Sequence, residues 1–392
     1  MKTTKIQRLL KQQDIEAWLL YDFRGLNPIA QRVTALEGRK ITRRWFCCLP
    51  QQGSPTWLIQ HIEQSHFQDV EGEHLVYGGW QELRSKLAQL LAGYRTVAME
   101  YSPHIPYVSR VDGGTLELVK STGVDVVTSA DLVQHVESKL SVEQFRGHQQ
   151  SARQILLAKD SAFEWIGQQI KSGKTITEYQ VQQRIMADFD RYNLVTDHPP
   201  IVAVNANSAD PHYAPTVNRH QPIMEGDLIL IDLWAKQTQH DAIFADTTWV
   251  GYVGQEVPEK YTRVFDVVRV ARDRAINFIK QRMSDGRITC GFEVDDVVRG
   301  WIQKSGYGDF FTHRTGHNIG REVHGNGVNM DNFESKDERQ LVEGICFSIE
   351  PGIYFSGDFG VRTEIDVFLA PPDQGGVVVS TAPVQTAVSP LL

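Results

Sequence analysis

Four acidic residues lie in strand-like segments of the second half of the chain, and they constrain its fold more than any other feature. They are Asp232, Asp246, Glu350 and Glu364. The first ends the apolar run 228–231, which has the length and composition of a buried strand. A carboxylate in that place lies at or near a buried position, where an unpaired charge costs several kcal/mol. Any one of these acids alone fits a strand end or a solvent face.

The last of these acids lies in the run 361–369, which predicts a single strand with two different faces. By the two-residue period of a strand, Arg362, Glu364 and Asp366 point to one face. Apolar residues and Thr363 alternate with them and point to the other face. The run therefore predicts that an arginine shares the face of the acids.

Three of the thirteen histidines fall within the segment 313–324. His313 and His317 are an even number of residues apart, so they share a face if the segment is extended. His324 is an odd number further along, so a turn or bulge, expected at Gly320, must re-aim its side chain. A polar surface loop is the alternative interpretation of such a cluster. The nearby acids favour a functional site.

The pattern of helices and strands predicts two domains. Residues 1–140 alternate short helices with short strands, which is typical of a small α/β domain. From Ser141 onward two capping-box spacings introduce long helices, and these alternate with paired strand runs. We therefore predict a second domain over residues 141–392, of the α+β class.

Six short segments carry a resemblance to a known family. They are Pro211-His212-Tyr213, Leu230-Ile231-Asp232-Leu233, Ala245-Asp246-Thr247-Thr248, the histidine segment 313–324, Phe347–Tyr354 and Phe359–Glu364. In this order they resemble the pita-bread metallopeptidases, which include Xaa-Pro dipeptidases, aminopeptidase P, methionine aminopeptidase and creatinase. The resemblance is closest to Xaa-Pro dipeptidase. It implies a pita-bread catalytic domain preceded by a smaller creatinase-type α/β domain.

The resemblance also implies a ligand set for two divalent metal ions. The ligands would be Asp232, Asp246, His317, Glu350 and Glu364. The physical chemistry agrees, since four carboxylates in one pocket carry a charge of about −4, which two divalent cations neutralise. Four carboxylates with one imidazole form a hard donor set, which favours manganese, with cobalt or zinc as alternatives. Two such ions would share a bridging hydroxide that attacks a carbonyl.

Further residues receive roles around this centre. Glu350 is both a ligand and the expected proton acceptor from the bridging water. His324 is expected to hydrogen-bond the tetrahedral oxyanion or the substrate carbonyl. His212 and His313 are expected to position the substrate, with a purely structural role as the alternative for both. Arg362 either meets a substrate carboxylate or offsets the acidic cluster.

Two departures from the family pattern bear on the site. Asp232 and Asp246 are fourteen residues apart, about three more than the family usually has. A longer hairpin loop can absorb the difference. Alternatively, His240 or Asp241 takes over as a ligand. Trp249 stands where the family usually has an arginine, so we expect a positive charge to be missing from the site.

The predicted function is metal-dependent hydrolysis of the bond that precedes proline in Xaa-Pro dipeptides. One alternative is an aminopeptidase P that acts on longer Xaa-Pro peptides. Others are a hydrolase or lyase of a small non-peptide molecule, and a catalytically inactive binding module. The partner is thus a small peptide, and the resemblance suggests a homodimer.

Composition excludes several other classes. With 40 basic and 48 acidic residues the chain carries a formal charge of −8, which argues against nucleic acid or anionic membranes as partners. No stretch approaches the ~18 apolar residues of a membrane span. The four cysteines are too few and too scattered for a disulfide framework. We therefore expect a cytoplasmic protein with reduced thiols.

Overall fold

The computed structural model describes residues 3–392, and the chain divides into two compact units, Met1–Glu137 and Ser138–Leu392. The first unit contains a six-stranded sheet in the order β4-β3-β2-β1-β5-β6. Its strands are β1 (Ala17–Asp22), β2 (Trp45–Pro50), β3 (Thr56–Gln60), β4 (Glu73–Tyr77), β5 (Thr96–Met99) and β6 (Asp125–Thr128). Strand β2 pairs antiparallel with β1 and β3, and the remaining pairs are parallel.

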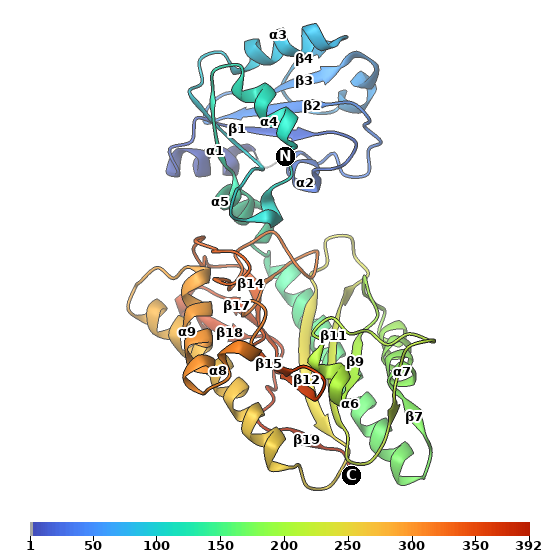
Figure 1. Cartoon of the computed structure of the whole chain (residues 1–392). Coiled ribbons are helices and arrows are strands. Elements are labelled where there is room, and N and C mark those ends of the chain that lie inside the picture. Colours follow the sequence, from blue (N-terminus) through green and yellow to red (C-terminus); the bar gives the residue numbers. More distant parts are fainter. Residues whose placement is uncertain (1–2) are drawn as a thin grey trace. The chain divides into compact units, whose positions relative to one another are not determined.

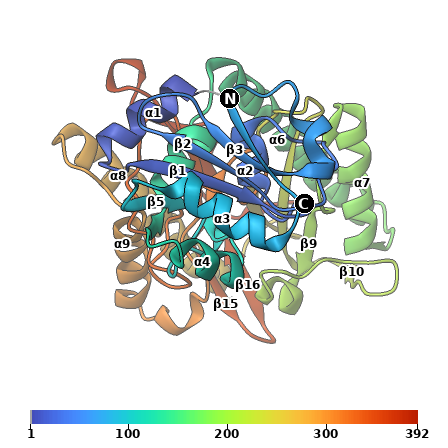
Figure 2. The same ribbon diagram turned by 90° about the horizontal axis from the view of Figure 1, so that it is seen from above.

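Helices cover both faces of this sheet (Figure 1). They are α1 (Thr3–Gln12), α2 (Pro28–Thr34), α3 (Trp80–Leu91), α4 (Gly113–Lys120) and α5 (Ala130–Val133). Trp18 and Leu20 of β1 pack with α1, α2 and α5, whereas Leu19 and Tyr21 pack with α3 and α4. Figure 2 looks onto the face that α3 and α4 cover. The alternation along β1 thus buries both faces, and the α/β class expected for this unit is confirmed.

The second unit begins with two long helices that pack on an antiparallel hairpin. Capping boxes at Ser141 and Thr177 start α6 (Val142–Lys171) and α7 (Glu178–Arg191), as the sequence predicts. The hairpin is β11 (Leu228–Gln237) and β12 (Ala245–Tyr252), with β8 (Leu194–Val195), β9 (Ile201–Val204) and β19 (Ser389–Pro390) beside it. Ile229, Ile231 and Leu233 of β11 pack against α6 and α7. The even-numbered residues of β11, Asp232 among them, therefore face the other way.

The rest of this unit forms a second set of strands covered by two helices. The strands are β13 (Asn318–Ile319), β14 (Cys346–Ile349), β15 (Gly352–Phe355), β16 (Phe359–Arg362), β17 (Ile365–Leu369) and β18 (Val377–Val379). The helices α8 (Glu259–Ser284) and α9 (Gly291–Lys304) share one large apolar core with strands β14 to β18. Figure 1 shows α8 and α9 beside β14, β17 and β18, and α6 beside β11 and β12. This arrangement confirms the α+β class expected for the second unit.

Short elements connect the main ones. They are β7 (Ile176–Thr177), β10 (Pro222–Ile223) and the helical turns η1 (His61–Phe67), η2 (Pro106–Val108), η3 (Gln134–Ser138), η4 (Asn205–Ala209), η5 (Gly308–Phe310) and η6 (Pro372–Gln374).

The single strand expected over 361–369 is wrong. The segment forms two strands, β16 and β17, separated by Thr363 and Glu364. The two halves pair with different strands, β16 with β15 and β17 with β14. At the break the backbone N–H of Glu364 donates to the carbonyl of Thr248, 3.2 Å away on β12. This hydrogen bond joins the segment to the hairpin at the break between β16 and β17.

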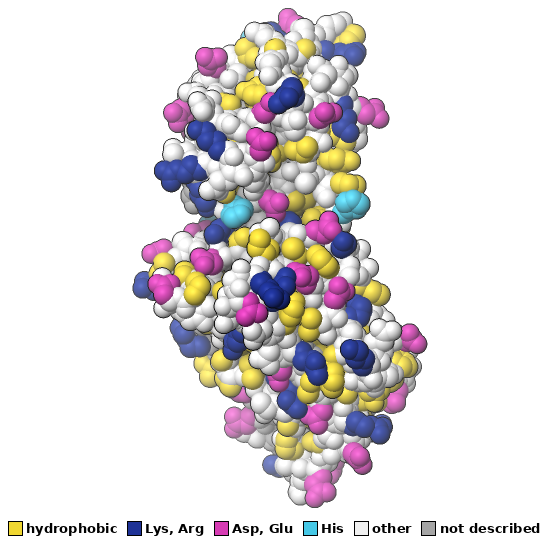
Figure 3. Space-filling model, turned by 90° about the vertical axis from the view of Figure 1, so that its left-hand side faces the viewer, with side chains coloured by type: hydrophobic (Ala, Val, Ile, Leu, Met, Phe, Trp, Pro, Cys, Tyr) yellow, Lys and Arg dark blue, Asp and Glu magenta, His cyan; other side chains and the backbone are white. Residues whose placement is uncertain are grey.

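Within residues 3–392 no helix is long and apolar enough to cross a membrane. On the face in Figure 3, acidic and basic side chains are interspersed. The picture of that face agrees with the nearly balanced charge of the chain.

Candidate active site

The β11–β12 hairpin places two of the predicted ligands side by side. Asp232 lies opposite Thr248, and Asp246 lies opposite Trp234. Since paired residues share a face, both carboxylates project from the side of the hairpin that α6 does not cover. The extra residues between them lie in the loop 238–244, after β11 ends and before β12 begins. The longer spacing therefore leaves both acids on the paired strands.

The alternative ligands in that loop lie in a different setting. His240 and Asp241 are both exposed. The ring of His240 lies beside the guanidinium of Arg321, with 3.2 Å between Nε2 and Nη2. Asp246 is instead buried, and its Oδ2 lies 3.8 Å from Nε2 of His317. The geometry thus favours Asp246 over the loop residues.

The other three predicted ligands converge on the same place from separate segments. Asp246, His317 and Glu364 offer ligand atoms that all lie within 4.8 Å of one another. Oε1 of Glu350 lies 3.3 Å from Nε2 of His317. Glu350 directly follows β14 and Glu364 lies at the β16–β17 break, so segments distant in the sequence build one centre.

The buried carboxylates have oxygen atoms without partners. Among residues 3–392, Oδ1 of Asp232, Oδ1 of Asp246 and Oε1 of Glu364 are buried without a hydrogen-bond partner. Burial, and then the neighbouring carboxylates, raise the pKa of Asp246 and of Glu364 well above the ordinary values. An unpaired buried acceptor costs free energy that a bound cation would recover. The set of four carboxylates and one imidazole, without thiolate, therefore fits hard divalent cations.

Glu350 lies at the more open side of the centre. Its side chain is 15% exposed, whereas that of His317 is 3% exposed. The hydroxyl of Ser348 donates to its Oε1 at 3.1 Å. Burial raises the pKa of Glu350 to about 7. A bound cation beside this carboxyl group would favour its ionised form, which can accept a proton.

His317 and His324 face each other across the site. The chain turns at Gly320, whose N–H donates to the carbonyl of Glu322, as the sequence predicts for re-aiming His324. The two rings meet edge to face, with centroids 4.3 Å apart. Loss of hydration lowers the pKa of His324 to about 4, although its side chain still reaches solvent. A neutral, accessible imidazole beside the ligands can donate a hydrogen bond to a bound substrate.

The other two predicted histidines lie in different settings. His313 uses both ring nitrogens within the protein, at 2.7 Å from the Tyr354 hydroxyl and 2.7 Å from the Arg314 carbonyl. Burial lowers the pKa of His313 to about 3. His212 is exposed in the loop after η4, and its charge also acts to lower the pKa of His324. His212 is thus open to a ligand, whereas His313 supports Tyr354.

Arg362 is buried and held by protein groups. It donates to Asp232 Oδ2 at 2.5 Å, to the Thr248 hydroxyl at 3.0 Å and to the Tyr354 hydroxyl at 3.0 Å. Its guanidinium is 4% exposed. Of the two roles expected for Arg362, this placement favours offsetting the acidic cluster.

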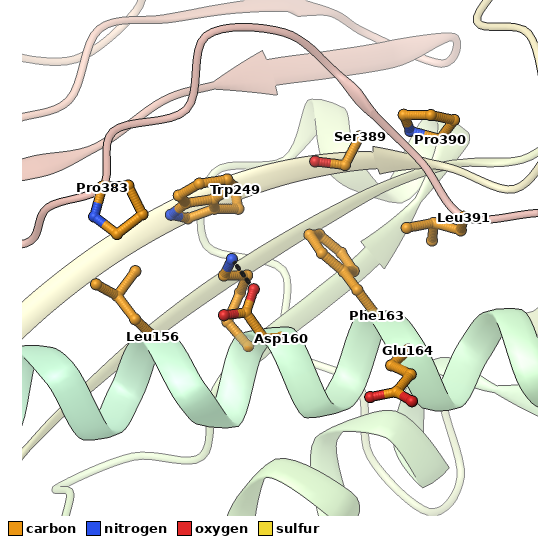
Figure 4. A pocket seen from close by; sticks show the side chains of 10 residues that line it. Leu156, Asp160, Phe163, Glu164, Trp249, Pro383, Ser389, Pro390 and Leu391 are labelled. Carbon is orange, nitrogen blue, oxygen red and sulfur yellow. Dashed lines mark hydrogen bonds and ion pairs between the residues drawn. The ribbon is translucent and has the colours of Figure 1, made fainter.

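The expected loss of a charge at Trp249 is wrong. Trp249 alternates with Thr248 along β12, so it projects from the opposite face of the hairpin and packs with α6. There it lines a cavity of about 360 Å³ together with Lys159, whose amine lies 3.6 Å from the indole centroid (Figure 4). A side chain at this position therefore starts from the face of the hairpin opposite to the carboxylates.

Two residues near the centre were given no role by the sequence. Asp366 is fully buried, and its Oδ2 accepts the backbone N–H of Asp246 at 2.8 Å. Nε2 of His148, on α6, lies 4.0 Å from the same carboxylate. The alternation of 362, 364 and 366 placed Asp366 on the correct side, whereas nothing in the sequence around His148 indicated its position.

The comparisons with known proteins agree with this site. The model of metallopeptidase family M24 matches residues 150–371, which include every predicted ligand. An Xaa-Pro dipeptidase of Lactobacillus delbrueckii subsp. lactis is 34% identical over 205 residues, or 52% of this chain and 51% of that relative. The chain thus matches about half the length of this curated relative.

Solved structures share the whole fold. The crystal structure of dipeptidase PepE from Mycobacterium ulcerans has a TM-score of 0.73 at 20% identity, covering 99% of this chain and 97% of that one. An X-prolyl aminopeptidase from Caenorhabditis elegans, described as a cytosolic enzyme with a di-nuclear active site, has a TM-score of 0.65 at 17% identity. It covers 98% of this chain and 63% of that chain. The family match, the fold and the convergent ligands together confirm the predicted relationship: this chain belongs to metallopeptidase family M24.

Proposed function

We propose that this protein hydrolyses the peptide bond that precedes proline in Xaa-Pro dipeptides, using two divalent metal ions. The proposed ligands are Asp232, Asp246, His317, Glu350 and Glu364. The observation that carries the proposal is that Asp246, His317 and Glu364 offer ligand atoms within 4.8 Å of one another, with Glu350 beside His317. Buried oxygens of Asp232, Asp246 and Glu364 have no hydrogen-bond partner in the described residues. The L. delbrueckii relative, named an Xaa-Pro dipeptidase, supports the substrate class. The hard donor set favours manganese, with cobalt or zinc as alternatives.

Two residues of the centre, Glu350 and His324, have proposed roles in the hydrolysis itself. Divalent cations, when bound, polarise a carbonyl and make water more acidic. Glu350 accepts the proton that the attacking water loses, since its carboxylate lies at the more open side of the proposed centre. His324 is neutral at neutral pH and donates a hydrogen bond to the substrate carbonyl, whose negative charge grows during attack.

The other predicted residues act on the substrate or on the ligands. His212 contacts the substrate from its exposed loop. His313 acts through Tyr354, which it holds by a hydrogen bond. Arg362 orients Asp232, and its positive charge offsets the acids that the cations must balance.

A substrate panel tests the proposal. Metal-depleted protein is supplied with Mn²⁺, Co²⁺ or Zn²⁺ and assayed on Ala-Pro, Leu-Pro and the tripeptide Ala-Pro-Ala. We expect metal-dependent cleavage of the dipeptides, loss of cleavage in Glu364→Gln, and little cleavage of the tripeptide. Equal cleavage of the tripeptide would favour aminopeptidase P activity, which the C. elegans neighbour represents. No metal-dependent cleavage of any of these would contradict the proposal.

We also propose an organisation for the whole protein. The catalytic domain comprises residues 141–392, which contain all the proposed site residues, and residues 1–140 form a creatinase-like domain. The resemblance to the family further supports a homodimer and a cytoplasmic location. Sedimentation equilibrium of the full chain tests the assembly, because a monomer at micromolar concentration would contradict it.

A further inference from the structure

Trp234 lies immediately beside the proposed metal ligands, yet neither the sequence pattern nor the proposed mechanism uses it. It lies two residues after Asp232 on β11 and directly opposite Asp246 on β12. Side chains paired in this way lie on one face, with Cβ atoms about 4.5–5.5 Å apart. The indole therefore borders the carboxylates on the face of the hairpin that bears them.

The indole of Trp234 packs against two apolar clusters. Trp234 packs against an apolar cluster that contains Tyr213, the neighbour of His212. It also packs against a second cluster, on which Val323, the neighbour of His324, packs as well. Trp234 is only half-buried. The partly exposed indole thus lies near the two loops that carry the proposed substrate-binding histidines.

The orientation of the indole is fixed by a hydrogen bond. Its Nε1–H donates to Oδ1 of Asp197 at 2.6 Å. Asp197 lies in the loop between β8 and β9, and it is close enough to His324 for its charge to act on that imidazole. An aromatic ring held at its polar edge offers its apolar surface to a ligand without losing much rotational freedom on binding.

From this geometry we infer that Trp234 is a specificity-determining residue whose exposed indole surface packs against the proline ring of the substrate. The inference rests on the proposed function. Proline is compact and apolar, and aromatic surfaces are a recurrent means of recognising it. Packing of the two additional ring carbons that distinguish proline from alanine corresponds to about a tenfold preference.

The test measures kcat/KM for Ala-Pro, Ala-Ala, Leu-Pro and Leu-Ala in wild type, Trp234→Phe and Trp234→Leu. Trp249→Phe and Trp249→Leu are matched controls, because Trp249 lies on the neighbouring strand but on the opposite face. We expect the preference for proline over alanine to fall about tenfold in Trp234→Leu, less in Trp234→Phe, and not in the controls. Metal content and thermal midpoints show whether each variant retains the folded centre.

Three results would overturn the inference. The first is an unchanged preference for proline in folded, metal-loaded Trp234→Phe and Trp234→Leu. The second is an altered preference between alanine and leucine at the first position, because the indole would then face the other side of the scissile bond. The third is an equal fall in the Trp249 controls. A wild type that cleaves no Xaa-Pro dipeptide would instead overturn the proposed function and this inference with it.

Discussion

Replacing Glu350 by glutamine should stabilise the protein when no metal is bound, and the gain should grow with pH. The carboxyl of Glu350 lies among other carboxylates, and burial raises its pKa from 4.5 to about 7. In the metal-free protein an ionised Glu350 is therefore unfavourable. Glutamine has nearly the same shape, can accept the hydrogen bond from the Ser348 hydroxyl at its amide oxygen, and carries no charge.

The pKa values set the size and the pH window of the effect. A group whose pKa is higher in the folded state stabilises the fold fully below its unfolded pKa, here near 4.5, and loses that stabilisation as the pH rises through about 7. Each tenfold change in proton affinity corresponds to about 1.4 kcal/mol. The free energy of unfolding of the metal-free variant should thus exceed that of metal-free wild type by about 3 kcal/mol at pH 8. At pH 5 the two values should be nearly equal.

The assay is urea unfolding of chelator-treated wild type and Glu350→Gln at pH 5, 6, 7 and 8. Buried histidines with lowered pKa values, such as His313, destabilise the fold as the pH falls. Both proteins contain these histidines, so their effect cancels when the free energy of unfolding of wild type is subtracted from that of the variant. With excess Mn²⁺ the order should reverse at pH 8, because the variant has lost a proposed ligand. A metal-free variant that is less stable than wild type at pH 8 would refute the reasoning.

Three further predictions concern individual side chains. Asp246→Asn and Glu364→Gln should each abolish activity and lower the metal content, which elemental analysis measures; full turnover with two metals per chain would remove that residue from the ligand set. His324→Ala should lower kcat by about 10²-fold with the metal content unchanged, if it acts as an oxyanion donor; loss of metal would show that it is a ligand. Arg362→Lys should weaken activity equally on an Xaa-Pro dipeptide and its C-terminal amide, because its contacts are with Asp232, Thr248 and Tyr354. A larger rise in KM for the dipeptide would instead place Arg362 against the substrate carboxylate.

Much of the centre could be predicted because strand periodicity carries the information. The apolar runs beside Asp232, Asp246 and Glu350 predicted buried strands, and strands are present at all three places. Asp232 lies within β11, Asp246 lies near the start of β12, and Glu350 follows β14. The order of short motifs supplied the proposed ligand set, and the geometry brings its members Asp246, His317 and Glu364 together. These features are local in the sequence, so a single chain is enough to see them.

Contacts between distant segments could not be predicted in the same way. The break at Glu364 depends on its bond to the backbone of Thr248, more than a hundred residues earlier. His148 reaches the centre because α6 packs on the hairpin, and no residue near it in the sequence signals that contact. Trp249 was assigned to the site from its position in a motif, whereas the two-residue period of β12 already places it on the other face.

The most direct test of the account is a crystal of the full chain soaked in Mn²⁺ and measured at the manganese absorption edge. The account predicts two anomalous peaks per chain. Both should lie among the carboxylates of Asp232, Asp246, Glu350 and Glu364, with one also against the imidazole of His317. Peaks that lie elsewhere, or the absence of any peak at these side chains at saturating Mn²⁺, would contradict the central claim that this cluster is a two-metal hydrolytic centre.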